Sequence, residues 1–463
     1  MAQRALVIGG GPGGSTTAAL LAAGGLEVWL LERDTFPRYH IGESLASSCR
    51  EVLSLSGAVD KVDAAGFPVK QGALWRWGAE ADWTINWSQQ MGPNVSSWQV
   101  DRADFDKLLL DHADSRGVRV VQGASVKRVL FDGDRGYAAE WIHDSGTHFT
   151  EFDYLVDASG RAGVLSAQHF RDRRRHEIFR NVAIWGYFDG GATLPNTPPG
   201  GIDVISHPDG WYWVIPLRGG RHSVGFVTHQ ATFLARRKDF TNIEEMYFAL
   251  VSESDTVRGL VSGASLSSSI RVEQDYSYVA DSFCGPNYFL VGDAACFLDP
   301  LLSTGVHLAL YSALLAAATV LAISRGEVTD EEGRGFYETA YRNAYARLLV
   351  LVSSVYEQYR GKSNYFWTAQ RMVAEKQGLS VRPDAAFTDI ISGSSDLRDA
   401  RGGQAATVTL KLIEAAERAR QAAAASSPSG VPIASLRIDP RDLADAASGL
   451  HLITTPHLGI GRA

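Results

Sequence analysis

Three glycines near the N-terminus have the spacing Gly-x-Gly-x-x-Gly, which lets a backbone approach a pyrophosphate closely. They follow a predicted apolar strand at 4–8 and open an Ala- and Leu-rich helix that we expect to reach about Ala23. A second strand at 27–31 leads to Glu32, whose carboxylate can accept hydrogen bonds from ribose hydroxyls. This βαβ context predicts a dinucleotide cofactor and not merely a tight turn. The residues predicted to hold it are Gly9, Gly11, Pro12, Gly14, Ser15, Glu32 and Arg33.

Two further segments carry side chains that suit a reaction compartment. Lys70 has the apolar neighbours Phe67, Val69 and Leu74, and burial among them would lower the pKa of its amine. The segment 210–216 contributes two large rigid indole rings and a proline, which fill space at low entropic cost and suit a barrier. The alternatives are a surface lysine at a strand end and a Trp-rich core strand, since the chain holds 11 Trp.

Two other predicted strand ends identify the cofactor by resemblance. The strand at 154–156 runs into Asp157-Ala-Ser-Gly160, and a later strand ends in Gly-Asp293-Ala, followed by Pro300. Both resemble flavin signatures of the large flavoprotein family that includes phenol hydroxylases and geranylgeranyl reductases. The resemblance implies FAD, with Asp293 reaching the ribityl chain and Arg102 near the flavin. The alternative for Arg102 is a salt bridge at a helix N-terminus.

The two compartment segments resemble signatures of the flavin-dependent halogenases. The run Trp211-x-Trp213-x-Ile215-Pro216 is similar to the tryptophan-rich motif that separates flavin from substrate in that family, and Gly66-Phe-x-x-Lys70-x-Gly72 resembles its lysine segment. The resemblance implies a reduced FAD that reacts with oxygen and chloride to form hypochlorous acid. It implies a catalytic Lys70 that hydrogen-bonds this oxidant or is chlorinated by it, and an oxidant path along Trp211, Trp213, Ile215 and Pro216.

Two more stretches match the same family. Phe36 to Leu45 resembles a strap that links the flavin and substrate sites, which implies flavin contacts from Ile41, Gly42 and Ser44. Ser303-Thr304-Gly305 begins a long uncharged helix, and backbone amides at the positive end of a helix dipole suit chloride. In related hydroxylases the same turn cradles the flavin ring, so that alternative stays open. The remaining cofactor contacts implied at this turn are Pro300, Gly305 and Val306.

One position departs from the family pattern. Tryptophan halogenases carry a Glu immediately before Ser-Thr-Gly, whereas this chain has Leu302. An electron-rich phenol or pyrrole activates its own ring and does not require that carboxylate. The departure therefore favours phenolic or pyrrolic substrates of natural-product pathways, and it leaves the proton acceptor unidentified.

The composition of the chain indicates its cellular location and excludes some classes of partner. The net charge is −8 with no long basic stripe, which argues against nucleic acid as a partner. Three cysteines without a CxxC spacing favour reduced thiols, no metal site and a cytoplasmic protein, and the N-terminus leaves no room for a signal peptide.

The segment 301–324 lacks charged residues and is long enough to span a membrane. Its Ala, Ser, Thr, Tyr and His content favours a buried helix instead, so no membrane association is expected.

The order of patterns predicts an α/β fold. We expect a Rossmann-like FAD-binding domain from the discontinuous segments 1–72, 99–165 and 281–325. Trp-rich alternating pieces predict an interleaved antiparallel-sheet substrate domain at 73–98 and 166–280. Residues 326–463 are predicted to be mainly helical to about Ala425, with a linker at 422–430 and an extended tail.

The resemblance also implies partners. They are a separate NAD(P)H-dependent flavin reductase and a small aromatic substrate, either free or tethered to an acyl or peptidyl carrier protein. The basic run Arg171–His176 could dock such a carrier, or it is a solvated loop. Competing functions are an aromatic hydroxylase and a non-oxygenating reductase-like flavoprotein. Aromatics that could shape a substrate cleft, or simply pack a helix, are Tyr356, Tyr359, Tyr365, Phe366 and Trp367.

Overall fold

The N-terminal βαβ unit forms as predicted. The computed structural model describes residues 3–78, 82–358, 388, 391–402 and 449–462. Strand β1 (Arg4–Ile8) leads through the glycine turn into α1 (Pro12–Ala23), and β2 (Glu27–Glu32) returns parallel to β1. A proline in the first turn of α1 is compatible with a helix start, because that amide has no intrahelical acceptor.

A six-stranded sheet extends this unit, in the order β18-β19-β11-β1-β2-β7. All neighbours are parallel except β18 and β19, which is the arrangement of a doubly wound dinucleotide-binding fold. The strands added to β1 and β2 are β7 (Arg119–Gln122), β11 (Tyr154–Asp157), β18 (Cys284–Gly285) and β19 (Tyr288–Leu290).

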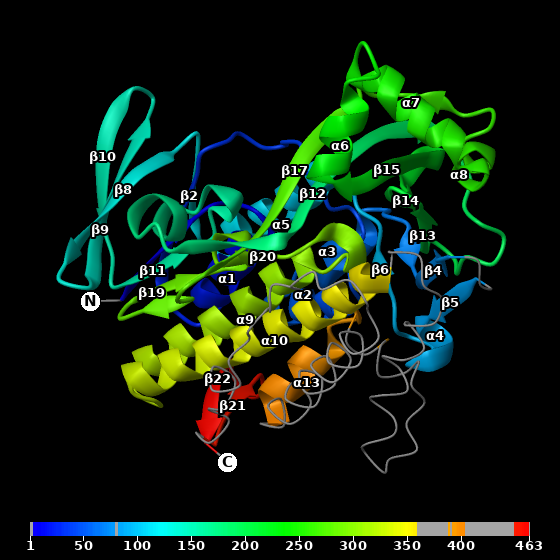
Figure 1. The fold of residues 1–463 in the computed structure, drawn as a ribbon. Coiled ribbons are helices and arrows are strands. Elements are labelled where there is room, and N and C mark those ends of the chain that lie inside the picture. The colour runs from blue at the N-terminus through cyan, green and yellow to red at the C-terminus, as the bar shows by residue number, and fades with distance from the viewer. Residues whose placement is uncertain (1–2, 79–81, 359–387, 389–390, 403–448, 463) are drawn as a thin grey trace, which may run out of the picture.

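Helix α9 (Gly305–Ser324) passes through the centre of the molecule beside α1 and α10 (Figure 1). It is long and apolar enough to cross a membrane, but 89% of its most apolar 18-residue window is buried inside the protein. A helix that is apolar on all sides is a core helix when other elements surround it. The prediction of a buried helix is therefore confirmed. The other α-helices in the described part of the chain are α2 (Ser48–Ser56), α3 (Val59–Ala64), α4 (Trp87–Gln90), α5 (Arg102–Ser115), α6 (Gln230–Arg237), α7 (Ile243–Glu253), α8 (Asp255–Leu260), α10 (Asp330–Gln358) and α13 (Ser394–Gly402).

A nine-stranded sheet forms the second lobe (Figure 1). Its order is β20-β17-β12-β15-β14-β13-β4-β5, with β16 paired to β12. Helices α6, α7 and α8 cover its outer face, where Phe233, Tyr247 and Val257 join the same apolar cluster as the strands. The strands are β4 (Gly72–Arg76), β5 (Trp83–Asn86), β12 (Arg173–Asp189), β13 (Ile202–His207), β14 (Gly210–Pro216), β15 (Arg221–His229), β16 (Ser265–Leu266), β17 (Arg271–Ala280) and β20 (Cys296–Phe297).

Several details differ from the sequence expectation. The sheet is not purely antiparallel, because β4 arrives from a distant segment and pairs parallel with β13. Strand β6 (Ser97–Trp98) is not part of this sheet but pairs with β3 (Val69–Lys70) in a separate two-stranded sheet. The strands β8 (Ser125–Asp132), β9 (Arg135–His143) and β10 (Gly146–Glu151) form a three-stranded sheet that the sequence reading missed.

The C-terminal tail is folded and not simply extended. Strands β21 (Leu450–Ile453) and β22 (Gly459–Arg462) pair as a hairpin, and Leu450, Leu452 and Ile460 are buried in the main core. Burial of these apolar side chains explains why a short tail adopts regular structure. The predicted linker at 422–430 lies outside the described residues.

Candidate active site

A cavity of about 670 Å³ lies between the carboxyl ends of the parallel strands and the nine-stranded sheet. Its volume falls within the roughly 300–1,000 Å³ of small-molecule and cofactor sites. Most of the predicted site residues line it, although they come from segments up to 300 residues apart. These are Gly9, Gly11, Pro12, Glu32, Arg33, Ile41, Gly42, Ser44, Arg102, Gly160, Trp211, Trp213, Ile215, Asp293, Pro300, Ser303, Thr304, Gly305 and Val306.

Five predicted residues do not line this cavity: Lys70, described below, and four that shape it, Gly14, Ser15, Asp157 and Pro216. A Cβ on Gly14 would lie 1.9 Å from the Gly9 carbonyl oxygen, so only glycine lets α1 approach β1 this closely. Ser15 donates to the Gly10 carbonyl at 2.9 Å, behind the turn. Asp157 accepts from the amides of Ser159 and Leu165 and thereby fixes the turn that carries Gly160. Pro216 ends β14 beside the cavity.

Glu32 is buried at the end of β2 and organises the glycine turn. One carboxylate oxygen accepts from the Gly10 amide at 2.6 Å, and the other accepts from the Asp34 amide at 2.8 Å. Each carboxylate oxygen has a second lone pair. The carboxylate is thus already oriented toward the cavity, with acceptor capacity left for the ribose hydroxyls of a dinucleotide.

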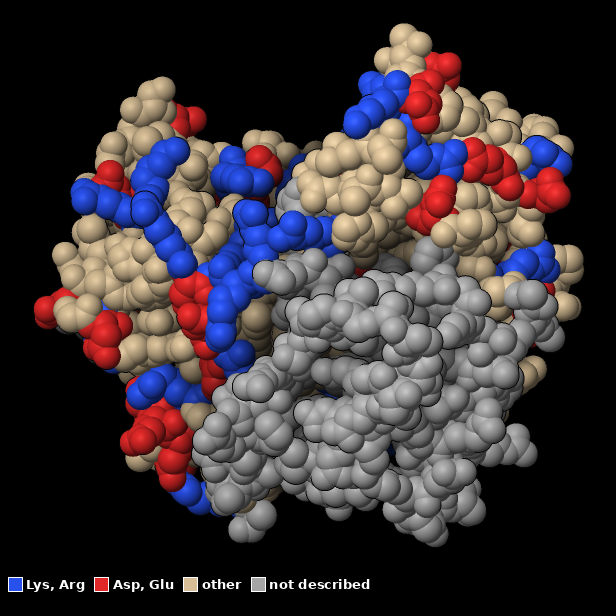
Figure 2. All heavy atoms as spheres, viewed as in Figure 1, with Lys and Arg blue, Asp and Glu red and all other residues tan. Residues whose placement is uncertain are grey.

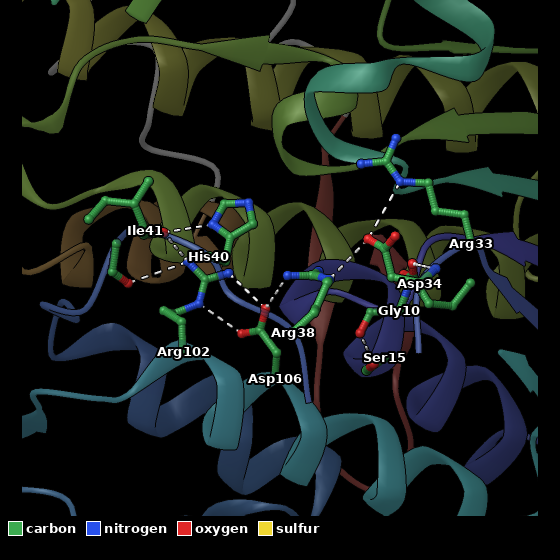
Figure 3. A network of polar contacts seen from close by, with 11 residues as sticks. Gly10, Ser15, Arg33, Asp34, Arg38, His40, Ile41, Arg102 and Asp106 are labelled. Atoms are coloured by element: carbon green, nitrogen blue, oxygen red, sulfur yellow. Dashed lines mark hydrogen bonds and ion pairs between the residues drawn. The ribbon is translucent and has the colours of Figure 1, made fainter. Parts of the chain in front are cut away.

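Arg102 anchors the strap, as Figure 3 shows. Its guanidinium makes a two-point ion pair with Asp106 at 2.8 and 3.0 Å and donates to the Ile41 carbonyl at 2.7 Å. Burial opposes its charge, but Asp106 raises the pKa of Arg102 above its ordinary value. Arg38 joins the same carboxylate at 3.3 Å. Arg102 therefore makes the helix-start salt bridge and also lines the cavity, and its position near the flavin stays a prediction.

Lys70 is 3% exposed, which rules out the surface alternative. Its Nζ donates to Ser44 Oγ at 2.8 Å and to the Leu45 carbonyl at 3.0 Å, and lies 5.0 Å from the ring centroid of Trp87. Burial lowers the pKa of Lys70 to about 7. Ser44 lines the flavin-sized cavity, so one hydroxyl separates that cavity from a buried amine able to lose its proton near neutral pH.

The strand β14 forms a wall of the cavity. Trp211, Trp213 and Ile215 alternate along it and face the cavity, whereas Tyr212 and Val214 face the outer core. The Trp213 ring centroid lies 6.1 Å from that of Trp211 and 6.2 Å from that of Trp185 on β12. The indoles thus belong to a core strand and to a site wall at once.

The start of α9 faces the same cavity. Ser303 has a left-handed φ of 55°, and the Asp299 side chain fixes the preceding turn by accepting from the Leu301 amide at 2.9 Å. The first amides of an α-helix have no intrahelical acceptor and form the positive end of its dipole. Thr304 and Gly305 therefore present donors suited to an anion or to a polar ring edge. Leu302 is buried and places no carboxylate there.

A chain of polar side chains in the cavity wall was not predicted from the sequence. Glu43 on the strap accepts from Tyr187 on β12 at 2.6 Å, and the hydroxyls of Tyr187 and Tyr39 are 3.0 Å apart. Trp185 Nε1 donates to the Tyr39 hydroxyl at 2.8 Å. The strap motif included Tyr39 and Glu43, but nothing in the sequence indicated that β12 would cross it.

Comparison with known proteins shows the family to which this chain belongs. The family model described as tryptophan halogenase matches residues 4–96 and 84–395. The chain belongs to the flavin-dependent halogenases. It is 41% identical to a tryptophan 2-halogenase of Chondromyces crocatus over 90% of this chain and 80% of that protein. It is 36% identical to a flavin-dependent halogenase of Penicillium aethiopicum over 88% of this chain and 80% of that protein.

Solved structures show the same fold. The myxobacterial chondrochloren halogenase superposes with a TM-score of 0.73 at 32% identity, covering 85% of this chain and 97% of that one. As a flavin-dependent halogenase, this enzyme uses FAD and a halide, and such enzymes generally need a separate flavin reductase and a small aromatic substrate. The cavity fits the cofactor, because Gly9 and Gly11 of the fingerprint, Glu32 and Asp293 all line one connected volume.

Proposed function

We propose that this halogenase chlorinates an electron-rich phenolic ring, using Lys70 to pass on the oxidant. When bound, reduced FAD would activate dioxygen by supplying two electrons to it, and the activated oxygen would then oxidise the halide. The observation that carries the proposal is the burial of Lys70 directly behind Ser44, with a pKa of about 7. Such an amine can hydrogen-bond hypochlorous acid or form a chloramine, and either presents an electrophilic chlorine to an aromatic carbon.

The other proposed roles follow from position. In the turn Ser303-Thr304-Gly305, the amides of Thr304 and Gly305 would hold chloride close to the flavin, whereas the Ser303 amide donates to the Pro300 carbonyl at 3.0 Å. Trp211 and Trp213 would exclude the aromatic substrate from the flavin, leaving only a path for a small oxidant. Segments 1–72, 99–165 and 281–325 would form the cofactor domain, and 73–98 with 166–280 the substrate domain.

A phenol is preferred as substrate because Leu302 supplies no carboxylate to the ring. The second candidate is an indole, which the 41% identical relative named tryptophan 2-halogenase favours. The aromatic residues Tyr359, Tyr365, Phe366 and Trp367, predicted to shape a substrate cleft, lie outside the described residues, as does the side chain of Tyr356.

A carrier-tethered substrate is supported by the distribution of charge. Figure 2 shows Lys and Arg side chains gathered in a band across the middle of one face. A second cavity of about 490 Å³ is lined by Arg161, Arg171, Arg173 and Arg175, and it shares Arg161 and Phe297 with the cofactor cavity. Arginine suits phosphate, so this surface could receive a phosphorylated carrier arm.

We also propose a cytoplasmic location, in keeping with the free cysteines among the described residues.

The test supplies enzyme, a flavin reductase, NADH, oxygen and chloride with a panel of phenols, pyrroles and indoles, both free and carrier-bound. Mass spectrometry should detect the chlorine isotope pattern in a phenol. Lys70→Ala should lose this product while FAD binding and peroxide release persist, and Lys61→Ala, an exposed lysine hydrogen-bonded to Ser115, should keep it. Retained chlorination in Lys70→Ala would remove the lysine from the reaction, and indole products alone would overturn the phenol assignment.

A further inference from the structure

The polar chain in the cavity wall runs from a partly exposed residue to a buried one. Tyr39 is 42% exposed, Tyr187 is 9% exposed and Glu43 is 3% exposed. Tyr39 and Glu43 both line the cofactor cavity, while Tyr187 bridges them from β12. Two tyrosines and a carboxyl therefore connect the outside of the strap to the flavin side of Ser44.

The hydrogen bonds of this chain have a consistent direction. An indole N–H only donates, so the Tyr39 oxygen is an acceptor from Trp185. When Tyr187 donates to an ionised Glu43, its single proton is committed, and Tyr39 must donate to Tyr187. A proton arriving at Tyr39 can then move inward by successive transfers along the chain. This leaves Glu43 protonated and reverses the two hydrogen bonds among Tyr39, Tyr187 and Glu43, while Trp185 still donates to Tyr39.

The chemistry on the flavin side consumes a proton. Reduced flavin, dioxygen, a halide ion and one proton give oxidised flavin, hypohalous acid and water, so electrons, atoms and charge balance. We propose that Tyr39, Tyr187 and Glu43 form a relay that delivers this proton from solvent to the flavin cavity. The relay rests on the proposed oxidation of halide.

The surroundings suit such a role. Burial raises the pKa of Glu43 above its ordinary value, which favours uptake of a proton by its carboxylate. The Arg271 guanidinium lies 3.7 Å from the ring centroid of Tyr39, and that of Arg221 lies 5.1 Å from the ring centroid of Tyr187. Arg102 on α5 also acts on Glu43, and its positive charge lowers the pKa of that carboxyl. Lys70 donates to Ser44, the residue next to Glu43.

A purely structural clasp between the strap and β12 is the competing explanation, and Glu43→Gln separates the two. Glutamine keeps an oxygen that accepts from Tyr187 but cannot take up and release the proton. The relay predicts that Glu43→Gln and Tyr187→Phe lower the rate of halogenation about 100-fold at pH 8, the usual scale of general acid–base catalysis. This loss of halogenation rate should be smaller at pH 6, where solvent supplies protons more readily. Both variants should also release more peroxide than the wild type.

Tyr247→Phe is the matched control. It also loses a buried phenol hydrogen bond, to the Val224 carbonyl at 2.8 Å, but on the opposite face of the same sheet. Infrared spectra of the flavin-free protein provide a readout independent of turnover. A protonated-carboxyl band should vanish in Glu43→Gln, shift in Tyr187→Phe and stay unchanged in Tyr247→Phe.

The outcomes are distinguishable. If the wild-type enzyme halogenates no acceptor, the proposed function fails, whereas the infrared result still reports on the carboxyl. If the wild type halogenates and Glu43→Gln matches it at pH 8, the relay is wrong and the chain is a clasp. If Glu43→Gln is slow by the same factor at pH 6 and pH 8, a general structural defect replaces proton delivery as the explanation.

Discussion

Two buried cations in this halogenase have opposite surroundings. Arg347 on α10 is 1% exposed and forms ion pairs with Asp396 and Asp399, the second at 2.6 Å. Lys70 is 3% exposed, and among the described residues its Nζ contacts only a hydroxyl, a carbonyl and an aromatic ring. Burial opposes the charge of both, but Asp396 and Asp399 raise the pKa of Arg347 whereas the pKa of Lys70 falls to about 7.

The difference separates a buried charge with carboxylate partners from one without them, which is what the proposed reactive role of Lys70 requires. Asp396 also accepts from His307 at 2.8 Å, and the other ring nitrogen of His307 lies 2.8 Å from Ser48 Oγ. This network joins α2, α9, α10 and α13, so its charges are balanced and it fixes helices in place. An amine without a carboxylate partner reduces stability, and its retention needs a chemical reason. The comparison predicts that removing each cation has opposite consequences for folding.

The largest expected effect is on stability in Arg347→Met. Removing the guanidinium leaves two buried carboxyls without their partner, which costs about 3–5 kcal/mol of unfolding free energy. Urea unfolding followed by circular dichroism measures it. Arg258→Met, which removes an exposed arginine paired with Asp255, should cost at most about 1 kcal/mol. Equal losses in the two variants would mean that the buried network contributes no more than a surface pair.

The second effect is opposite in sign and depends on pH. The pKa of Lys70 is about 7 when folded and near its ordinary value of 10.5 when unfolded, so the unfolded chain binds the extra proton between these values. The folded protein is therefore penalised fully below pH 7, and the penalty disappears as the pH rises toward 10.5. Lys70→Met should raise the unfolding free energy by about 1–3 kcal/mol at pH 6.5 and by little at pH 10. A loss of stability at pH 6.5 would show that Lys70 has a stabilising partner.

The surroundings of Lys70 and of Arg347 show which parts of the fold and of the site can be predicted from the sequence. The glycine fingerprint, Lys70 and the Trp211 strand are local patterns, and their βαβ or alternating context places them in the correct elements. Tyr187 and Asp396 carry no such pattern, because their roles depend on which distant segment packs against them. The hairpin at 450–462 was missed for a similar reason, since its apolar residues acquire a partner only when α9 and α13 are in place.

The third effect concerns the protonation state that reacts. With a pKa of about 7, the neutral fraction of Lys70 increases roughly tenfold between pH 6 and pH 8. We expect the halogenation rate of a non-ionising aromatic acceptor to rise by about that factor, because a free lone pair is needed to form a chloramine. Lys70→Arg should be inactive at every pH, since a guanidinium stays charged. A rate that falls with pH, with activity retained in Lys70→Arg, would instead support hydrogen bonding by the ammonium.

The smallest expected effect tests whether Lys70 truly lacks an anionic partner. Cys49 is fully buried near Lys70, and burial raises the pKa of its thiol to about 12, so at neutral pH it carries no charge. Cys49→Ala should then leave the midpoint of the pH–rate profile within about 0.3 pH unit of the wild type. Cys49→Asp, in contrast, should change the midpoint, because a carboxylate beside the amine gives Lys70 the kind of partner that Arg347 already has. The midpoint would then move upward and activity at pH 7 would fall. If Cys49→Ala instead moved the midpoint sharply downward, a thiolate would be pairing with Lys70, and the two buried cations would differ in degree only.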